Sequence, residues 1–392
     1  MKPTTTAARV LQSTAIFLIA ACAISTRASE QKSSNLTTKD STRTLKAPPS
    51  HGHAGASKRT RRQTQPPRKS DTSGPLYASR PDALQAADEM ALRLGLDPQW
   101  VRHAIGQAHY MPGIARAISP PAVGTQKNWT VYRSRFIDSV RINTGVKFWR
   151  DNRETLERAE QQTGVPAAII VGVIGVETIY GQQTGSYRVM DALATLAFDF
   201  PAQHPRAKER AAFFRSELEA FLELTHRTTT DPMAMRGSYA GAMGLPQFMP
   251  SSWNKYAVDF DGDGRIDLFH SAADVIGSVA NYFKAFQWRP GMPTHYPVRL
   301  NAQGEDKAAL LAPDILPTFS ASTMVDKGAE LDISAMQHSG PLALVELQDG
   351  DRPPLYIAGT ENFYAITRYN WSSYYALAVI ELGQDVAAAM SK

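Results

Sequence analysis

Apolar side chains recur at helical spacing through most of the chain from about residue 76 onward. In 82–96, Leu84, Ala87, Ala91 and Leu94 share one face, and the following Asp97-Pro98 pair is typical of a new helix start. Amphipathic spacing also predicts helices over 148–162, 206–225, 271–286 and 373–390. We therefore expect a mainly helical fold.

The pattern changes between about residues 291 and 360. Short apolar runs at 343–347 and 355–358 are separated by Gly, Pro and Asp, which is typical of strands and turns. We predict the α+β class, mainly α, with a small antiparallel β domain over 291–360 and a C-terminal segment, 361–392, that returns to the helical core.

Residues 165–178 form a segment that is apolar on every side except for one charge, Glu177. Pro166 suits a first helical turn, and we expect the helix to end at about Gly181. A helix without a polar face is buried, and burial favours the protonated form of a carboxyl group. A proton held near neutral pH is what a glycosidic general acid needs. Spacing alone leaves open a structural Glu177, neutralised by an arginine or by helix-end amides.

The N-terminus has the pattern of an export signal. Lys2 and Arg9 precede an apolar run at 15–21, which is too short to span a membrane as a helix. The run ends at Cys22, the only cysteine, in a stretch (19–22) that resembles a lipoprotein processing box. The alternative is an ordinary signal peptide with an incidental cysteine. A single cysteine excludes an intramolecular disulfide.

Residues 23–75 are rich in Ser, Thr, Lys, Arg and Pro, so we expect a disordered basic tether. Its charge could contact an anionic polymer or serve solubility alone. Residues 1–30 carry a net charge of +2 and residues 31–75 carry +8, so 76–392 carry −5 of the chain's total of +5. An acidic globular part disfavours nucleic-acid binding.

Two loops carry candidate chemistry. The small-residue stretch 237–244 allows close approach of a backbone or ligand, and it lacks the Gly-Lys-Ser/Thr ending of a phosphate loop. The second loop, 259–270, resembles an EF-hand: Asp259, Asp261 and Asp263 supply carboxylates, and Arg265 supplies a backbone carbonyl. Position 12 holds His270 in place of a bidentate carboxylate, and imidazole suits a hard cation poorly. We expect weak structural Ca²⁺ binding, or a loop that folds without metal.

Four segments together resemble the membrane-bound lytic murein transglycosylase B family. They are Gly-Val-Glu-Thr-Ile-Tyr-Gly at 175–181, Asp-Ala-Leu-Ala-Thr-Leu at 191–196, the stretch 237–252, and Asn-Phe-Tyr-Ala-Ile-Thr-Arg-Tyr-Asn at 362–370. Their order and spacing match the family, and the resemblance covers roughly 76–392.

The resemblance implies a helical domain (76–165) and a lysozyme-like catalytic core (166–290). It also implies cleavage of the MurNAc–GlcNAc β-1,4 bond without water, leaving 1,6-anhydro ends. Glu177 would act as general acid and then base, with no cofactor for catalysis. One carboxylate suffices when the substrate's own acetamido group assists.

The resemblance places Ser238 near Glu177 and assigns further substrate contacts to Gln247, Phe248, Tyr282, Tyr369, Tyr375 and Arg210. From spacing alone the tyrosines are ordinary core residues. Arg210 follows an apparent insertion at 202–205, which puts its assignment in doubt.

We expect a monomeric periplasmic lipoprotein, anchored in the outer membrane through Cys22, whose partner is peptidoglycan and not nucleic acid. Two alternatives remain at this stage. A lysozyme-type hydrolase would use the same acid and add water. A non-catalytic wall-binding scaffold would keep the groove without needing Glu177.

Overall fold

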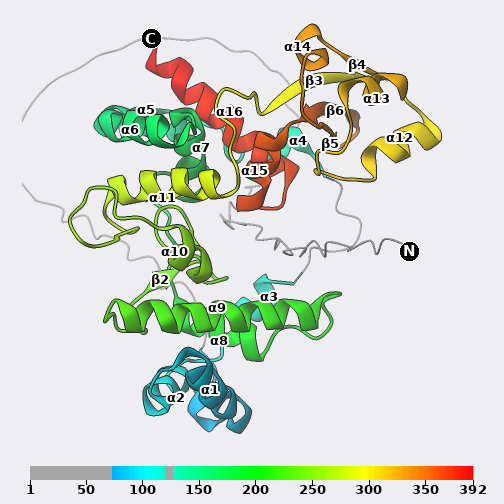
Figure 1. The fold of residues 1–392 in the computed structure, drawn as a ribbon. Coiled ribbons are helices and arrows are strands. Elements are labelled where there is room, and N and C mark those ends of the chain that lie inside the picture. The colour runs from blue at the N-terminus through cyan, green and yellow to red at the C-terminus, as the bar shows by residue number, and fades with distance from the viewer. Residues whose placement is uncertain (1–72, 120–126, 392) are drawn as a thin grey trace, which may run out of the picture. The chain divides into compact units, whose positions relative to one another are not determined.

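The computed structural model describes residues 73–119 and 127–391 (Figure 1). The export signal, Cys22 and nearly all of the expected tether lie outside the described residues.

Helices dominate the described chain. After a 3₁₀ turn (Tyr77–Ser79) come α1 (Pro81–Leu94), α2 (Pro98–Gly106), α3 (Pro112–Ala117), α4 (Trp129–Arg133), α5 (Ser139–Asp151), α6 (Arg153–Thr163), α7 (Ala167–Thr178), α8 (Val189–Phe198), α9 (Ala207–Arg227), α10 (Pro250–Tyr256), α11 (Ala272–Ala285), α12 (Gly304–Leu311), α13 (Ala321–Asp326), α14 (Ile333–Met336), α15 (Glu361–Tyr369) and α16 (Ser373–Met390).

The strands form two antiparallel sheets. A two-stranded ribbon pairs β1 (Tyr187–Arg188) with β2 (Arg236–Gly237). The second sheet has the order β4-β3-β6-β5, from β3 (His295–Leu300), β4 (Ala329–Leu331), β5 (Ala343–Asp349) and β6 (Arg352–Gly359). This sheet has its own small apolar core, which includes Leu342, Leu344 and Ala358. The predicted class, mainly helical α+β with a small antiparallel sheet, is confirmed.

The apolar helix α7 lies at the centre of the larger core, beside the C-terminal helix α16 (Figure 1). The two helices approach closely through glycine. A Cβ atom at Gly172 would overlap the carbonyl oxygen of Val379, and one at Gly383 would overlap that of Ala168. The C-terminal helix therefore returns to the helix that carries Glu177.

Most predicted elements are present, with three corrections. The segment 148–162 is not one helix, because the chain breaks at Asn152 between α5 and α6. Helix α7 ends at Thr178, earlier than Gly181, because Ile179 and Tyr180 adopt left-handed φ angles of 52° and 54°. The region 291–360 contains three short helices, α12 to α14, as well as strands.

Among the described residues, no single helix is both long and apolar enough to cross a membrane. The pair α6 and α7 passes that test by length and composition only, across a bend of 116°.

Candidate active site

Glu177 occupies the last turn of α7, where the chain turns out of the core. Thr178 fixes this turn, because its hydroxyl donates to the carbonyl of Leu245 (2.9 Å) and accepts from the N–H of Gly181 (3.0 Å). The end of α7 is thereby joined to the loop that follows the small-residue stretch 237–244. The predicted acid thus lies where the core helix meets this loop.

The carboxyl group of Glu177 is held in a largely apolar environment. Burial raises its pKa to about 7, and a hydrogen bond of 2.6 Å, donated by the Tyr375 hydroxyl to Oε1, acts in the opposite direction. No described arginine contributes to this pKa, so the sequence alternative of an arginine-neutralised structural glutamate has no support here. The residue keeps some exposed surface, so a ligand can reach it.

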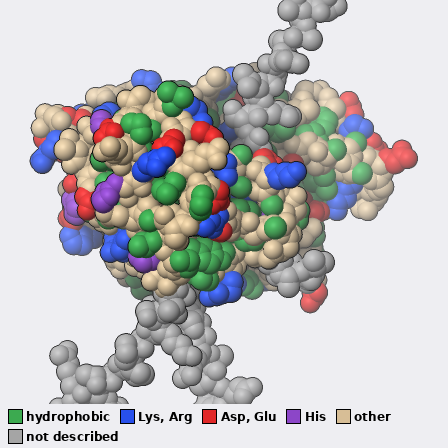
Figure 2. Space-filling model, turned by 90° about the horizontal axis from the view of Figure 1, so that it is seen from below, with side chains coloured by type: hydrophobic (Ala, Val, Ile, Leu, Met, Phe, Trp, Pro, Cys, Tyr) green, Lys and Arg blue, Asp and Glu red, His purple; other side chains and the backbone are tan. Residues whose placement is uncertain are grey.

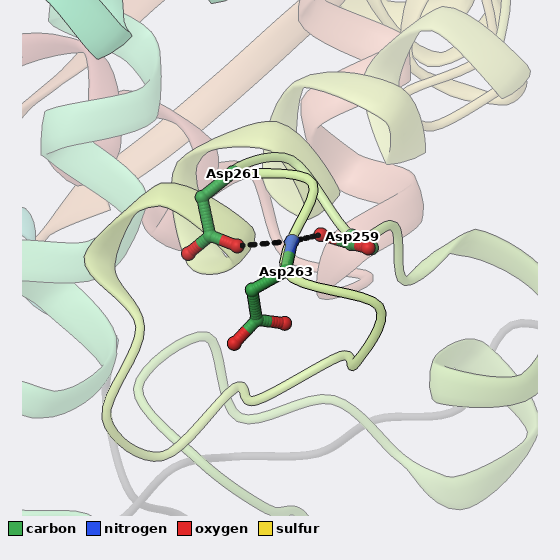
Figure 3. A group of neighbouring side chains, drawn as sticks. All are labelled: Asp259, Asp261 and Asp263. Carbon is green, nitrogen blue, oxygen red and sulfur yellow. Dashed lines mark hydrogen bonds between the residues drawn. The ribbon is translucent and has the colours of Figure 1, made fainter.

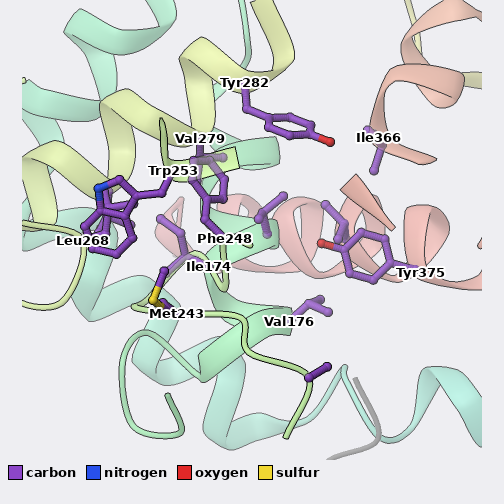
Figure 4. Close-up of a cluster of buried hydrophobic side chains, with 14 of the residues drawn as sticks. Ile174, Val176, Met243, Phe248, Trp253, Leu268, Val279, Tyr282, Ile366 and Tyr375 are labelled. Carbon is purple, nitrogen blue, oxygen red and sulfur yellow. The ribbon is translucent and has the colours of Figure 1, made fainter. Parts of the chain in front are cut away.

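An aromatic cluster of Phe248, Tyr282, Tyr369 and Tyr375 adjoins Glu177. Tyr369 stacks on Tyr375 with 6.4 Å between ring centroids and 13° between planes, and it lies 4.8 Å from Tyr282 and 5.8 Å from Phe248. Figure 4 shows Phe248 and Tyr282 on one side of this region and Tyr375 on the other. The hydroxyls of Tyr282 and Tyr369 donate to the carbonyls of Arg368 and Pro246. The structure therefore brings four of the predicted residues together beside Glu177.

Sequence reasoning missed Tyr132 of α4. The charge of Glu177 contributes to raising the pKa of Tyr132, as it does for Tyr369, so both rings lie near the carboxyl group. Tyr132 belongs to none of the four segments that carried the family resemblance, and no local pattern marks it. Only tertiary packing brings α4 to the end of α7.

Ser238 and Gln247 brace the loop between β2 and α10. The Ser238 hydroxyl accepts from the N–H groups of Ala242 (3.0 Å) and Ala240 (3.3 Å). Gln247 has a φ of 52°, and its amide donates to the carbonyls of Gly244 (2.9 Å) and Thr184 (3.1 Å). Both side chains thus hold the backbone of the loop in this structure.

Arg210 lies inside α9 and is almost fully buried. Its guanidinium group lies 5.3 Å from the ring centroid of Phe214, and burial is the main cause of a lowered pKa. Tyr239, in the small-residue stretch, is close enough to affect that pKa. Arg210 therefore faces the same loop as Ser238.

The predicted calcium loop brings its three carboxylates together. Ligand oxygens of Asp259, Asp261 and Asp263 lie within 4.8 Å of one another on the surface (Figure 3). The N–H of Asp263 donates to both other aspartates at 3.2 Å, and Asp259 also accepts from Gly262 (2.7 Å) and Gly264 (2.8 Å). The donor set fits a hard cation, and the loop also satisfies these carboxylates with its own amides.

One further carboxylate, beyond the four aspartates of the loop 259–270, escaped prediction. Asp274 in the first turn of α11 is buried and accepts from the N–H groups of Phe260 and Asp267, both at 2.8 Å. Its pKa is raised, mainly by burial and in part by the charge of Asp261. His270 points elsewhere: it is mostly exposed and pairs with Asp267 at 3.0 Å. Asp274 lies beyond the 12-residue loop template, which is why the template missed it.

A glycan-cleaving enzyme is the class that this fold and site suggest. Glu177 lies at the end of a buried helix, its pKa is raised by burial, and aromatic rings adjoin it. The chain belongs to the transglycosylase SLT domain family, whose model matches residues 79–384.

Several known proteins are similar to the chain along most of its length. It is 40% identical over 325 residues to membrane-bound lytic murein transglycosylase B of Escherichia coli (strain K12), covering 80% of this chain and 84% of the relative. The E. coli lytic transglycosylase Slt35 in complex with bulgecin A superposes with a TM-score of 0.72 at 40% identity, covering 81% of this chain and 96% of Slt35. Slt35 has also been solved in complex with calcium. SltB3 from Pseudomonas aeruginosa, in complex with NAG-anhNAM-pentapeptide, gives a TM-score of 0.63 at 30% identity, covering 78% of each chain.

Proposed function

We infer that the chain is a lytic transglycosylase of peptidoglycan, which cleaves the MurNAc–GlcNAc β-1,4 bond without water and leaves 1,6-anhydro-MurNAc ends. The observation that carries this inference is the Glu177 carboxyl, whose pKa of about 7 keeps a transferable proton at neutral pH. The similarity to a murein transglycosylase over most of the chain supports the choice of substrate.

We assign the two oxygens of Glu177 different tasks. Oε1 accepts a hydrogen bond from the Tyr375 hydroxyl, so Oε2 is the oxygen that carries the proton to the glycosidic oxygen. The C1–O bond then breaks, and Oε1 remains stabilised by Tyr375 while the group is a carboxylate. The carboxylate next takes the proton of the MurNAc C6 hydroxyl, which bonds to C1 and closes the anhydro ring. Proton and charge balance without water, because the acid is regenerated.

We propose that the substrate groove runs along the aromatic cluster and the loop 237–248. Its residues are Ser238, Gln247, Phe248, Tyr282, Tyr369, Tyr375 and Arg210, with Tyr132 added from the geometry. Phe248, Tyr282 and Tyr375 are buried, so we assign them to the wall that shapes the groove, and the loop amides suit the acetamido groups of the sugar.

We propose a weak structural Ca²⁺ site at Asp259, Asp261, Asp263 and the carbonyl of Arg265. The proximity of the three carboxylates supports it, and so does a calcium complex of Slt35. When bound, the ion would neutralise the loop's charge, and catalysis does not pass through it. His270 stands where a bidentate carboxylate is expected and pairs with Asp267 instead, which favours weak binding.

We further propose that Cys22 is lipidated and that the protein acts in the periplasm, anchored in the outer membrane. A relative named as membrane-bound supports an anchor. Metabolic labelling with palmitate should mark the natural chain and leave Cys22→Ser unlabelled; equal labelling of both would contradict the anchor.

We also propose the division of the chain into a helical domain (76–165), a lysozyme-like catalytic core (166–290), a small β domain (291–360) and a C-terminal segment that returns to the core (361–392).

Solubilisation of insoluble peptidoglycan by the full chain tests the activity. We expect turbidity to fall with the natural protein and to stay constant with Glu177→Gln. Equal clearing by both proteins would exclude Glu177 as the acid, and no clearing by either would favour a wall-binding scaffold.

A further inference from the structure

A second hollow lies away from Glu177, between α2 and the end of α9. Its volume is about 670 Å³, within the usual size range of ligand sites. The α2 side supplies Trp100, His103 and Gln107, and the other side is formed by His226 and residues 229–233. Figure 2 views the molecule from the side of α1 and α2, and histidine side chains gather at one edge of that face.

A smaller hollow of about 290 Å³ adjoins the first. It also contains His103 and Gln107 in its lining and reaches Leu76 and Ala78 at the start of the described chain. Because the two hollows share these two side chains, they form neighbouring compartments along α2. This arrangement suits a ligand made of repeated units better than one small molecule.

The larger hollow combines an aromatic ring with neutral hydrogen-bonding groups. Trp100 is half-buried, and its ring is held edge-on by His226 at 5.2 Å and 76°. An indole of this kind offers an apolar face with little conformational freedom to lose on binding. Gln107, Thr229 and Thr230 supply amide and hydroxyl groups that can donate and accept. The Gln107 amide contacts the His103 ring, and the Thr230 hydroxyl bonds to that of Thr228 (2.9 Å), so both would share these bonds with a ligand.

Charge argues against an anionic ligand. Asp231 is the one acidic residue of the larger hollow, and it accepts from the N–H of Met233 at 2.9 Å. The one arginine of the smaller hollow, Arg102, is already paired with Asp88. Apart from His103 and His226, which are cationic only when protonated, no described residue of the larger hollow carries a positive charge. Phosphates and acidic peptides therefore find little to pair with, whereas a neutral polyhydroxy ligand meets matching groups.

We propose that these compartments form a second, non-catalytic saccharide-binding site for the N-acetylated glycan of peptidoglycan. The identity of the glycan rests on the proposed function. The site is tied to the groove through the chain itself: Met233, in its wall, lies four residues before Gly237, where β2 leads into the active-site loop. Its task is to hold insoluble wall material while Glu177 cleaves a strand.

Calorimetric titration of the full chain with chitotetraose, a neutral GlcNAc oligomer, tests the site. Glu177→Gln is used as background so that no sugar is cleaved. We expect two binding events, and we expect Trp100→Ala or Gln107→Ala to weaken one of them about tenfold or more. Leu92→Ala, on α1 and 85% exposed, is the control and should keep both.

The second site is overturned if every binding event of the background protein persists unchanged in both the Trp100→Ala and the Gln107→Ala variants. It is also overturned if the background protein does not bind chitotetraose. Should Trp100→Ala lower the melting temperature strongly, Gln107→Ala decides, because Gln107 is exposed.

Activity separates this inference from the proposed function. With Glu177 present, Trp100→Ala should cleave a soluble peptidoglycan tetrasaccharide at the natural kcat but clear insoluble peptidoglycan several-fold more slowly. Equal clearing would contradict the second site. Failure of the natural chain to cleave the tetrasaccharide would contradict the proposed function and leave the binding result intact.

Discussion

Two opposing effects set the acidity of Glu177, and they can be separated by pH. Burial raises the pKa to about 7 against the lowering effect of the Tyr375 hydroxyl. The general acid must be protonated, so kcat/KM should fall as pH rises through about 7. Because the hydrogen bond favours the carboxylate, Tyr375→Phe should move this alkaline limb up by about one pH unit, or about 1.4 kcal/mol.

Tyr282→Phe is the matched control for that profile. Its hydroxyl donates to the carbonyl of Arg368, not to Glu177, so the limb should stay in place. An alkaline limb at the same pH in Tyr375→Phe and the natural protein would refute the role given to this hydrogen bond.

The same carboxyl group should cost stability at alkaline pH. In the unfolded chain it ionises near 4.5, and in the folded chain near 7, so folding binds a proton between these values and stability falls as pH rises through them. Above pH 7 the unfolding free energy is lowered by the full amount, up to about 3 kcal/mol. Glu177→Gln carries no charge, so it should exceed the natural protein in unfolding free energy at pH 8 but not at pH 4.

Chemical denaturation at the two pH values provides the measurement. The exposed Glu157→Gln serves as control and should change little at either. The prediction compares the unfolding free energies of Glu177→Gln and the natural protein. If their difference is the same at pH 4 and at pH 8, the site does not destabilise the anionic form of Glu177.

At the residue level, the sequence singled out Glu177 but only part of its surroundings. Glu177 stood out because one charge in an apolar helix is locally visible. Tyr132 and Asp274 could not be predicted in this way, because each reaches its place through packing of another helix. Ser238 and Gln247 were predicted by resemblance, and their hydrogen bonds inside the loop depend on its backbone path.

At the level of elements, glycine allows α7 and α16 to pack closely. Gly172→Ala would place a methyl group against the carbonyl oxygen of Val379. Because both the methyl-bearing Cα of α7 and the carbonyl of α16 belong to helix backbones, neither can move away easily. We expect a loss of about 1–3 kcal/mol in unfolding free energy, measured by denaturant titration.

Gly106→Ala is the control for this close approach. Its new methyl group would lie 3.4 Å from its nearest neighbour, Ala78 Cβ, which is ordinary contact, and alanine favours the helix. Equal stability of the Gly172→Ala and natural proteins would mean that the helices can move apart freely.

The calcium loop should respond to metal only weakly. His270 replaces a bidentate carboxylate at position 12, so we expect the melting temperature to rise in millimolar but not micromolar Ca²⁺. Asp261→Asn should abolish the rise, and Asp351→Asn, an exposed acid outside the loop, should retain it. A full shift at micromolar Ca²⁺ would contradict weak binding.

The elements differed in how well periodicity predicted them. Long amphipathic helices such as α9 and α11 were found because their apolar positions repeat over several turns. The break at Asn152 was missed because the polar and apolar positions at the end of α5 and in α6 follow the spacing of a single amphipathic helix. The short helices α12 to α14 have too few turns for a period to emerge.

In the molecule as a whole, the returning C-terminus brings Tyr375 to Glu177. Tyr375 of α16 and Glu177 of α7 are 198 residues apart in sequence, yet a hydrogen bond joins them. The antiparallel sheet lies between these two helices in sequence and keeps a small core of its own. This arrangement explains why the family segments are spread over the chain and why no single segment defines the site.

Mass spectrometry of peptidoglycan digested by the full chain, with Glu177→Gln beside it, tests the central claim most directly. We predict fragments with 1,6-anhydro ends, one water lighter than hydrolysis products, and none from the variant. Fragments with reducing ends would mean that the same acid serves a hydrolase. Anhydro products from Glu177→Gln would contradict the assignment of Glu177 as the catalytic acid.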